Sequence, residues 1–408
     1  MSWNGRCMAM AGSSDQQQVH QSEPESWVGV GCSDLSDNRA ALERALEELA
    51  LQWEPRLLIV FAAPRYDLEQ LGANLSERMP GCSVIGCTTS GEIAVGRALT
   101  HSLVLWALGG QGVRVSTGYG ISDGQGLRQA SVQAASCLDR LERRRNTVLV
   151  LLSDGLGGDQ MEVVRGAYDA AYIDVPLVGG CAGDYLAMQQ TRQLHGKRVM
   201  SGAVVTAAIS SDRPLGIGVS HGWTAASEPM LVTESRGTIL SSLDDRPALD
   251  VYLEFFNPPR EIHDDPQAFA DFAAVHPIGI RRRDRIEMRH ITGFDRDQRA
   301  LVMVAEVPQG ALAFLTQGDY TSVLEAAAES ANSAISALDG DAPAGLLLFD
   351  CVSRRSIFGD RHVQEETDLI ARSCGRPPMA GFYTYGEIAR TKGSGGFHNQ
   401  TLVTLAIG

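Results

Sequence analysis

Val84-Ile85-Gly86-Cys87-Thr88-Thr89-Ser90-Gly91-Glu92 is a short apolar strand followed by a glycine turn that ends in an acid. The pattern returns as Leu177-Val178-Gly179-Gly180-Cys181-Ala182-Gly183-Asp184 and as Met379-Ala380-Gly381-Phe382-Tyr383-Thr384-Tyr385-Gly386-Glu387. In each copy an apolar strand and a helix of about four turns precede the turn, and another apolar strand follows it. Three copies of one pattern indicate a repeated structural unit, and this repetition decides the architecture before any single motif is interpreted.

The segments around these turns predict sheets buried between helices. The leading strands are nearly continuous apolar runs, which is typical of strands buried on both faces. A strand, a helix and a second strand in this order form a right-handed parallel crossover. The predicted leading strands, helices and closing strands are 57–61, 66–79 and 103–108, then 148–152, 159–171 and 203–209, then 346–349, 361–373 and 402–407. We therefore predict an α/β fold with α+β portions, in which repeated strand–helix–strand units with Gly-rich turns form mixed sheets flanked by helices.

The rest of the chain suggests a tail and two domains. Residues 1–26 are polar and without periodicity, so we expect a disordered tail. Three short alternating segments between Ile286 and Thr316 predict an antiparallel meander, whereas residues 258–275 are polar and predicted to be loops. A boundary near residue 245 gives an N-terminal domain, 27–245, with two copies, and a C-terminal domain, 246–408, with the meander and the third copy.

Composition narrows the class of protein. The 408 residues carry a formal net charge of −14, which argues against a nucleic-acid-binding surface, because such surfaces neutralise phosphates with Lys and Arg. The eight cysteines lack zinc or haem-attachment spacing and suit reduced thiols. No secretory signal is recognisable, and no apolar run approaches the ~18–20 residues that span a bilayer. We expect a cytoplasmic protein that binds neither membrane nor nucleic acid.

The glycine turns are candidate ligand-binding segments. Two glycines after a buried strand permit close backbone approach, and the exposed N–H groups of such a turn can hold a carboxylate or carbonyl. Hydroxyls and a terminal acid add acceptors for an amine. The predicted ligand-binding residues are Gly86, Cys87, Thr88, Ser90, Gly91, Glu92, Asp184, Tyr383, Tyr385, Gly386 and Glu387. The alternative is architectural: a turn repeated three times can simply be a tight turn whose acid caps neighbouring backbone.

Two further kinds of residue lie at strand ends. Asp154 and Asp350 follow apolar strands, where parallel α/β sheets usually bind ligands. Cys87 and Cys181 follow glycine at strand ends, where a thiol of lowered pKa could act as a nucleophile. Small cysteines in glycine-rich turns are more often inert packing, so an enzyme that uses a thiol is the third hypothesis for function.

The motifs resemble those of a known family, the FIST sensory proteins, in which a FIST N domain precedes a FIST C domain. Tyr66-Asp67 with 84–93 is similar to the opening signature of the family. Residues 381–388, followed by Asn399-Gln400-Thr401-Leu402, are similar to its closing signature. Residues 219–223 and 272–279 also match, so the resemblance spans 27–408.

This resemblance implies a sensor and no catalytic residues. FIST domains are thought to bind small ligands and to pass the signal to partners. One stand-alone bacterial branch, the nitric-oxide-sensing proteins called NosP, binds haem and acts on a histidine kinase or a cyclic-di-GMP enzyme linked to biofilm formation. The chain has the same stand-alone layout without a recognisable output domain, so we expect it to act on such a partner in trans. Whether it forms a homo-oligomer stays open.

For haem b, the resemblance requires one histidine to hold the iron, and the sequence leaves the choice open. Non-covalent haem needs a single protein ligand and an apolar slot, and so leaves almost no spacing signature. His221 is the first candidate, because it follows an apolar strand and precedes Gly222-Trp223; the alternatives are His195, His276 and His398. The competing hypothesis is a FIST-type sensor of amino acids or another small metabolite, without haem, that uses Glu92 or Glu387 to hold an amine.

Overall fold

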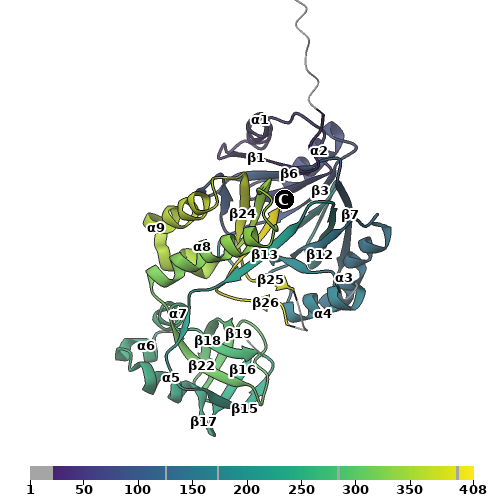
Figure 1. Ribbon diagram of the computed structural model, residues 1–408. Helices are drawn as coiled ribbons and strands as arrows, with labels where there is room; N and C mark the ends of the chain where they lie inside the picture. Colours follow the sequence, from purple (N-terminus) through teal and green to yellow (C-terminus); the bar gives the residue numbers. More distant parts are fainter. Residues whose placement is uncertain (1–21, 125, 172–173, 283–284, 392–394) are drawn as a thin grey trace, which may run out of the picture.

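The three sequence repeats form three copies of one unit, in which two helices cover a sheet (Figure 1). The structure, a computed structural model, describes residues 22–408 except 125, 172–173, 283–284 and 392–394. Most of the predicted tail, residues 1–21, therefore lies outside the described residues. The predicted α/β fold with mixed sheets flanked by helices is confirmed.

Each unit runs through the same order of strands and helices. Unit 1 comprises β1 (Trp27–Ser33), α1 (Asn38–Leu49), β2 (Leu57–Ala62), α2 (Leu68–Arg78), β3 (Ser83–Thr88), β4 (Glu92–Ala94), β5 (Arg97–Leu99) and β6 (Leu103–Gly109). Unit 2 comprises β7 (Val113–Ile121), α3 (Gly126–Ala135), the 3-10 helix η1 (Ser136–Arg140), β8 (Asn146–Ser153), α4 (Gln160–Ala170), β9 (Leu177–Cys181), β10 (Gln193–His195), β11 (Arg198–Met200) and β12 (Ala203–Ser211). Unit 3 comprises β13 (Leu215–Ser220), α8 (Tyr320–Ser336), β23 (Gly345–Cys351), α9 (Val352–Ser373), β24 (Met379–Thr384), β25 (Glu387–Arg390), β26 (Phe397–His398) and β27 (Leu402–Ile407).

The leading strands, α2 and α4 form where the sequence pattern predicts them, whereas α9 begins at Val352, nine residues before the predicted start at 361. β2, β8 and β23 lie in the middle of their sheets, where apolar side chains fill both faces. α2 and α4 begin at Asp67 and Asp159, whose carboxylates accept backbone N–H groups of the first turn. α2 then buries Leu68, Leu71 and Leu75 against its sheet. β2 and β3 pair in parallel, as the predicted crossover requires.

Each unit completes the sheet of another unit. The hairpin that follows each glycine turn leaves its own sheet: β4 pairs with β24 of unit 3, β10 with β3 of unit 1, and β25 with β9 of unit 2. The exchange is cyclic, so the three sheets are linked in a closed ring. The strand orders are β1-β6-β2-β3-β10-β11, β26-β25-β9-β8-β12-β7 and β13-β27-β23-β24-β4-β5.

The three sheets share one apolar core. Their inner faces meet in a single cluster that includes Phe61 of unit 1, Leu152 of unit 2 and Phe349 and Phe382 of unit 3. The Phe61 and Phe382 rings stack with centroids 4.9 Å apart. The outer faces are covered by α1 and α2, by α3 and α4, and by α8 and α9, each pair with its own apolar cluster.

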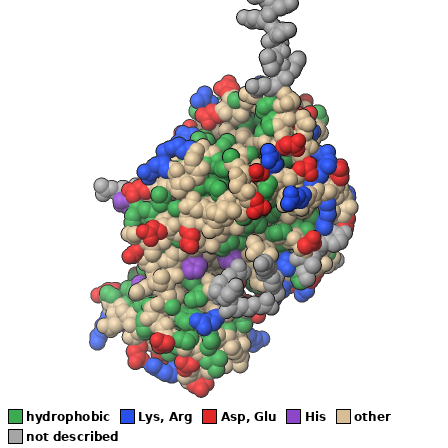
Figure 2. Space-filling view, viewed as in Figure 1, with side chains coloured by type: hydrophobic (Ala, Val, Ile, Leu, Met, Phe, Trp, Pro, Cys, Tyr) green, Lys and Arg blue, Asp and Glu red, His purple; other side chains and the backbone are tan. Residues whose placement is uncertain are grey.

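A separate domain is inserted into unit 3, between β13 and α8. It contains β14 (Thr224–Ala225), β15 (Met230–Arg236), β16 (Ile239–Leu243), β17 (Arg246–Pro247), α5 (Ala248–Phe256), α6 (Arg260–Asp264), α7 (Pro266–Ala274), β18 (Ile278–Arg282), β19 (Arg285–Arg289), β20 (Ile291–Asp295), β21 (Ala300–Met303) and β22 (Leu312–Gln317). Figure 2 shows it as a lobe below the core, with histidine side chains at the constriction. Position 245, where we divide the sequence, lies between β16 and β17 of this domain.

Two expectations for this region have different outcomes. The three segments predicted between Ile286 and Thr316 form strands of one antiparallel sheet, but among the described residues they do not form a meander, because β19, β21 and β22 pair with β18, β16 and β15 and not with one another. The loops predicted for 258–275 are wrong, since α6 and α7 occupy most of this stretch. Asp265 caps α7 and Pro266 is its first residue. Because the two helices are short and rich in polar residues, the sequence shows too few turns for a helical period to be recognised. In the described part of the chain, every helix is too short or too polar to cross a bilayer.

We predict that Gly86→Ala destabilises the protein. A Cβ at Gly86 would lie 2.4 Å from the Val60 carbonyl oxygen on the neighbouring strand, and the equivalent Gly381 has the same contact with Leu348 at 2.1 Å. The strands must shift, which lowers the free energy of unfolding by about 1–3 kcal/mol in urea titrations. The matched control is Gly293→Ala in β20, which has no atom within 4 Å of the added carbon. Equal stability of the two variants would contradict the prediction.

Candidate functional site

The acids that end the first and third turns are buried and bonded within their own units. The carboxylate of Glu92 accepts the backbone N–H of Ser102 at 2.9 Å and its hydroxyl at 2.6 Å. Glu387 accepts the N–H of Thr401 at 3.2 Å. In unit 2 the equivalent position is Gln193, whose amide oxygen accepts the N–H of Ala203 at 3.3 Å. Each side chain thus joins the start of an exchanged hairpin to its end, so its first role is architectural.

Burial changes the proton affinity of these acids. Both Glu92 and Glu387 have no exposed surface, and desolvation raises the pKa of each carboxyl. Hydrogen bonds from Ser102 and Thr89 act in the opposite direction on Glu92. A buried carboxyl of raised pKa can hold a proton or accept a hydrogen bond from an amine. Glu92 is therefore a candidate ligand-binding group in addition to its architectural role.

The three predicted turns meet in space. The Ser90 N–H donates to the Tyr383 carbonyl at 3.1 Å, and the Tyr383 N–H donates to the Gly91 carbonyl at 2.8 Å. The Gly183 N–H donates to the Thr88 carbonyl at 3.0 Å, and the Tyr385 N–H donates to the Cys181 carbonyl at 3.1 Å. The structure therefore brings together Ser90, Gly91, Glu92, Asp184, Tyr383 and Tyr385 of the predicted ligand-binding residues.

The remaining predicted residues lie deeper. Gly86, Cys87 and Thr88 belong to β3, and the Thr88 hydroxyl accepts the Arg192 N–H at 3.0 Å. Gly386 lies against the Phe397 ring, and Gly386 and Glu387 pair with β9. These residues support the turns from within.

Unit 2 alone extends its turn with a loop. Glu92 follows Gly91 directly and Glu387 follows Gly386 directly, whereas residues 185–192 separate Asp184 from Gln193. The Asp184 carboxylate accepts the N–H groups of Met188 at 3.0 Å and Gln189 at 2.7 Å. The Tyr385 hydroxyl donates to the same carboxylate and accepts the Leu186 N–H at 2.7 Å. Burial acts to raise the pKa of Asp184, but the bonds from Tyr385 and the loop N–H groups lower it overall.

This loop is strained and covers the first turn. Tyr185, Leu186 and Met188 have φ of 58°, 61° and 52°, a left-handed conformation that costs about 1–3 kcal/mol for each such residue. The Tyr185 N–H donates to the Ser90 hydroxyl at 3.0 Å, and its own hydroxyl lies 3.3 Å from Glu92. Its ring stacks on His101 at 4.4 Å. Strained residues held by specific bonds over a buried carboxylate are typical of functional loops, and sequence analysis identified Asp184 but missed Tyr185.

A second buried cluster lies at the carboxyl end of β23. Arg354 has no exposed surface; its guanidinium donates to Asp350 at 2.8 Å and to Glu366 at 2.5 Å. The same guanidinium donates to the carbonyls of His221 at 3.1 Å and Val323 at 3.0 Å, which flank the inserted domain. Burial and the charge of Asp350 raise the pKa of Glu366 well above its ordinary value. Asp350 was a predicted strand-end residue; its partner Arg354 lies in the first turn of α9, so the pair joins a strand to a helix and no helical spacing predicts it.

The thiol hypothesis meets an unfavourable environment. Cys87 and Cys181 have no exposed surface. Burial raises the pKa of Cys181 to about 12 and that of Cys87 well above its ordinary value. A thiolate is therefore disfavoured at both positions, and a reactant would have no path to the sulfur.

The candidate haem ligands differ in the state of the imidazole. The Nδ1 of His221 accepts the Trp223 N–H at 3.0 Å, which uses the single lone pair of a neutral ring, so His221 does not fit an iron ligand as it stands. His195 bonds the Thr117 hydroxyl at 3.1 Å, and buried His398 donates from Nε2 to the Ala389 carbonyl at 3.0 Å. His276 donates from Nδ1 to the Phe272 carbonyl at 2.8 Å, which leaves the Nε2 lone pair free, as haem and metal ligands require.

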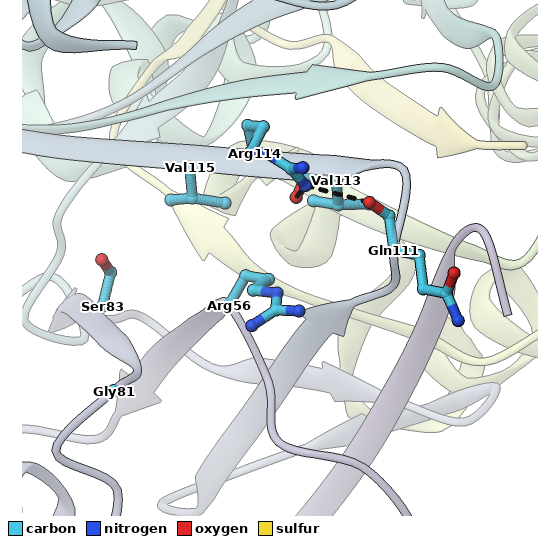
Figure 3. A pocket seen from close by; sticks show the side chains of 7 residues that line it. All are labelled: Arg56, Gly81, Ser83, Gln111, Val113, Arg114 and Val115. Carbon is cyan, nitrogen blue, oxygen red and sulfur yellow. Dashed lines mark hydrogen bonds between the residues drawn. The ribbon is translucent and has the colours of Figure 1, made fainter. Parts of the chain in front are cut away.

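Three cavities in the described part of the chain lie away from these histidines and from the turns. Figure 3 shows one of about 590 Å³ between the starts of β2, β3 and β7, into which the guanidiniums of Arg56 and Arg114 project. A second, of about 710 Å³, lies on α8, and a third, of about 220 Å³, lies in the inserted domain beside His263. Within the described residues, no group of three His, Cys, Asp or Glu side chains is placed to hold a metal ion.

Comparison with known proteins assigns most of the chain. The FIST N domain family matches residues 56–246, and the FIST C domain family matches residues 248–390. Two relatives from Mycobacterium tuberculosis are each 24% identical over 392 residues, which is 92% of this chain and 97% of the relative. They are uncharacterized protein MT0656 of strain CDC 1551 / Oshkosh and uncharacterized protein Rv0628c of strain ATCC 25618 / H37Rv.

We predict that Glu366→Gln flattens the dependence of stability on pH. Between the ordinary Glu pKa of about 4.3 and the raised pKa of folded Glu366, only the folded state keeps this proton. Stability from this group is therefore complete below about pH 4 and is lost as pH rises, by up to about 1.4 kcal/mol per pH unit. Urea unfolding at a series of pH values above about 4.3 should show a shallower slope for the variant. Exposed Glu77→Gln is the control, and parallel curves for wild type and Glu366→Gln would refute the assignment.

Proposed function

The chain belongs to the FIST family, with a FIST N and a FIST C domain, and on that premise we propose that it binds a small molecule under the loop 185–192 and signals its presence to a partner protein. FIST domains are generally small-ligand-sensing domains of signalling proteins and not catalytic ones. The observation that carries the proposal is the position of this loop over the first glycine turn. Tyr185 covers Ser90 and Glu92, and Tyr385 of the third turn holds the loop by a hydrogen bond.

The chemistry beneath the loop favours a ligand with an amine. If Tyr185 withdraws, Glu92 loses one hydrogen-bond donor and presents carboxylate oxygens beside the Ser90 hydroxyl. An ammonium group would supply the missing donor and the positive charge that a buried carboxylate needs. An amino acid or a similar metabolite is thus the ligand class that this geometry supports best.

Loop strain supplies a way to couple binding to a change of shape. The left-handed residues Tyr185, Leu186 and Met188 persist because Asp184 and Tyr385 hold them. A ligand that displaces Tyr185 removes part of this support and favours another loop conformation. Such a ligand shifts the equilibrium only by its difference in affinity for the two conformations.

A haem-dependent sensor of nitric oxide is the second candidate, and one observation favours it. His276 has a free Nε2, and its ring lies between Phe272 at 4.2 Å and Phe256 at 4.4 Å, an apolar aromatic setting that suits a porphyrin edge. Bound haem would supply an iron that takes up nitric oxide. In this hypothesis His276 replaces His221 as the axial ligand, and the protein would regulate a histidine kinase or a cyclic-di-GMP enzyme in trans.

We predict that primary amines of the amino acid class raise the thermal unfolding temperature. At a ligand concentration of about 100 times Kd, stabilisation amounts to about 2.7 kcal/mol. Glu92→Gln should abolish the shift, because an amide cannot neutralise an ammonium group, whereas exposed Glu69→Gln on α2 should retain it. Differential scanning fluorimetry over a panel of amino acids and amines measures both. Either a wild type unmoved by the whole panel or an unchanged shift in Glu92→Gln would remove this ligand class.

For the second candidate, we predict a Soret band in haem-reconstituted wild type that moves when nitric oxide is added. His276→Ala should lose or broaden the band, and His221→Ala should keep it, because the His221 lone pair is already used. Absorption spectra of the three proteins at equal concentration decide the matter. A wild type without a Soret band after reconstitution would end the haem hypothesis.

A further inference from the structure

β7 is a nine-residue strand at the end of its sheet. It pairs with β12 on one side only, residue for residue from Val113 to Ile121. In an antiparallel pair, alternate residues direct their backbone groups toward the partner and away from it. The Gly118 carbonyl faces β12, where it accepts the Thr206 hydroxyl, so the odd-numbered residues face the open edge.

The open edge keeps free backbone donors. The carbonyls of Val113 and Thr117 accept guanidinium N–H groups from Arg114 and Arg140, both at 2.9 Å. In the described part of the chain, no group accepts a hydrogen bond from the amides of Val115, Thr117 or Tyr119. Such an edge is a template for one more strand.

Cations without counter-ions line this edge. Arg140 lies on the Thr117 carbonyl, and Arg198 lies over the Tyr119 ring at 5.1 Å with Lys197 beside it. Among the described carboxylates, none forms an ion pair with Arg140, Lys197 or Arg198, although the whole chain carries a net charge of −14. The His195 ring, 5.0 Å from the Tyr119 ring, adds a second aromatic group to this flank.

The equivalent edges of the other units have the opposite character. On β1, the Cys32 N–H donates to the Glu48 carboxylate at 3.2 Å, so an acid already occupies that edge. At the end of β13, Ser220 bonds Glu329 at 2.7 Å. Among the described residues, an acid thus contacts the β1 and β13 strands, whereas β7 has free amides beside cations that form no ion pair. A second copy of the chain is a poor occupant, because its β7 would set cations against cations.

We propose that β7 is the docking site for an extended acidic segment of a partner protein, which adds as a strand along Val113–Ile121 and pairs its carboxylates with Arg140 and Arg198. Backbone hydrogen bonds supply affinity that does not depend on the side chains of the partner. The cations add a preference for acidic sequences. Arg140 exchanges the Thr117 carbonyl for a carboxylate when the strand binds. This proposal names the chemistry of the partner required by the proposed function, and it rests on that function only for the existence of a partner.

The test uses the full chain and an acetylated nonapeptide of alternating Thr and Glu, with a Thr and Lys peptide as control. Fluorescence anisotropy should show saturable binding of the Glu peptide that weakens with added salt, and no binding of the Lys peptide. Amide exchange should slow at Val115, Thr117 and Tyr119, which face the open edge, and stay unchanged at Ser116 and Gly118. The double variant Arg140→Glu, Arg198→Glu should raise Kd by about tenfold or more.

The matched control is Arg39→Glu, an exposed cation on α1 that should leave Kd unchanged. The proposal is overturned if the Glu peptide fails to bind, if the double variant binds it as well as wild type, or if protection appears elsewhere than on β7. Peptide binding is measured without any small ligand. A chain that binds the peptide but responds to no amine or haem would retain the docking site and lose the sensing proposal. A chain that responds to an amine or haem but binds no peptide would retain the sensing proposal and lose the docking site.

Discussion

The architecture depends on a polar side chain that closes each exchanged hairpin. Glu92, Gln193 and Glu387 stand at the first residue of β4, β10 and β25, and each accepts a backbone N–H at or just before the strand that returns to its own sheet. Both carboxyls and the residues that donate to them are buried, so breaking either bond would leave a backbone N–H without its acceptor, at about 1–3 kcal/mol. That constraint places the three glycine turns in contact, and the turns in turn define where a ligand and a loop can meet.

Comparison of the units with one another separates structure from function. Where the three agree, as at Gly86, Gly179 and Gly381 beside the neighbouring strand, the residue serves the fold. Where one departs, the departure has a consequence. Unit 2 adds the loop over Glu92 and a cationic edge, and unit 3 adds a lobe whose two connections are bonded by one buried guanidinium, that of Arg354. The functional features therefore lie on the differences among repeats.

The sequence predicted much of the fold and part of the candidate site. Apolar runs and capped helices are local signals, so the repeats and their crossovers could be derived. The exchange of hairpins could not, because pairing between β4 and β24 joins residues far apart in sequence. Spacing identified Ser90, Glu92 and Tyr385 as candidate ligand-binding residues, but it did not predict that Tyr185 lies over them. The choice of His221 rested on neighbouring residues, whereas fitness as an iron ligand depends on which ring nitrogen is bonded, a property that only the fold determines.

The closed ring of exchanged hairpins has a consequence for biosynthesis. A ribosome delivers β9 of unit 2 long before β25, the strand of unit 3 that must lie beside it. The sheet of unit 2 therefore stays incomplete until unit 3 has been synthesised, and apolar residues such as Val178 lack a neighbouring strand until then. The nascent polypeptide therefore cannot complete one repeat at a time, and until unit 3 is available the unpaired edge of β9 is a segment that molecular chaperones could protect.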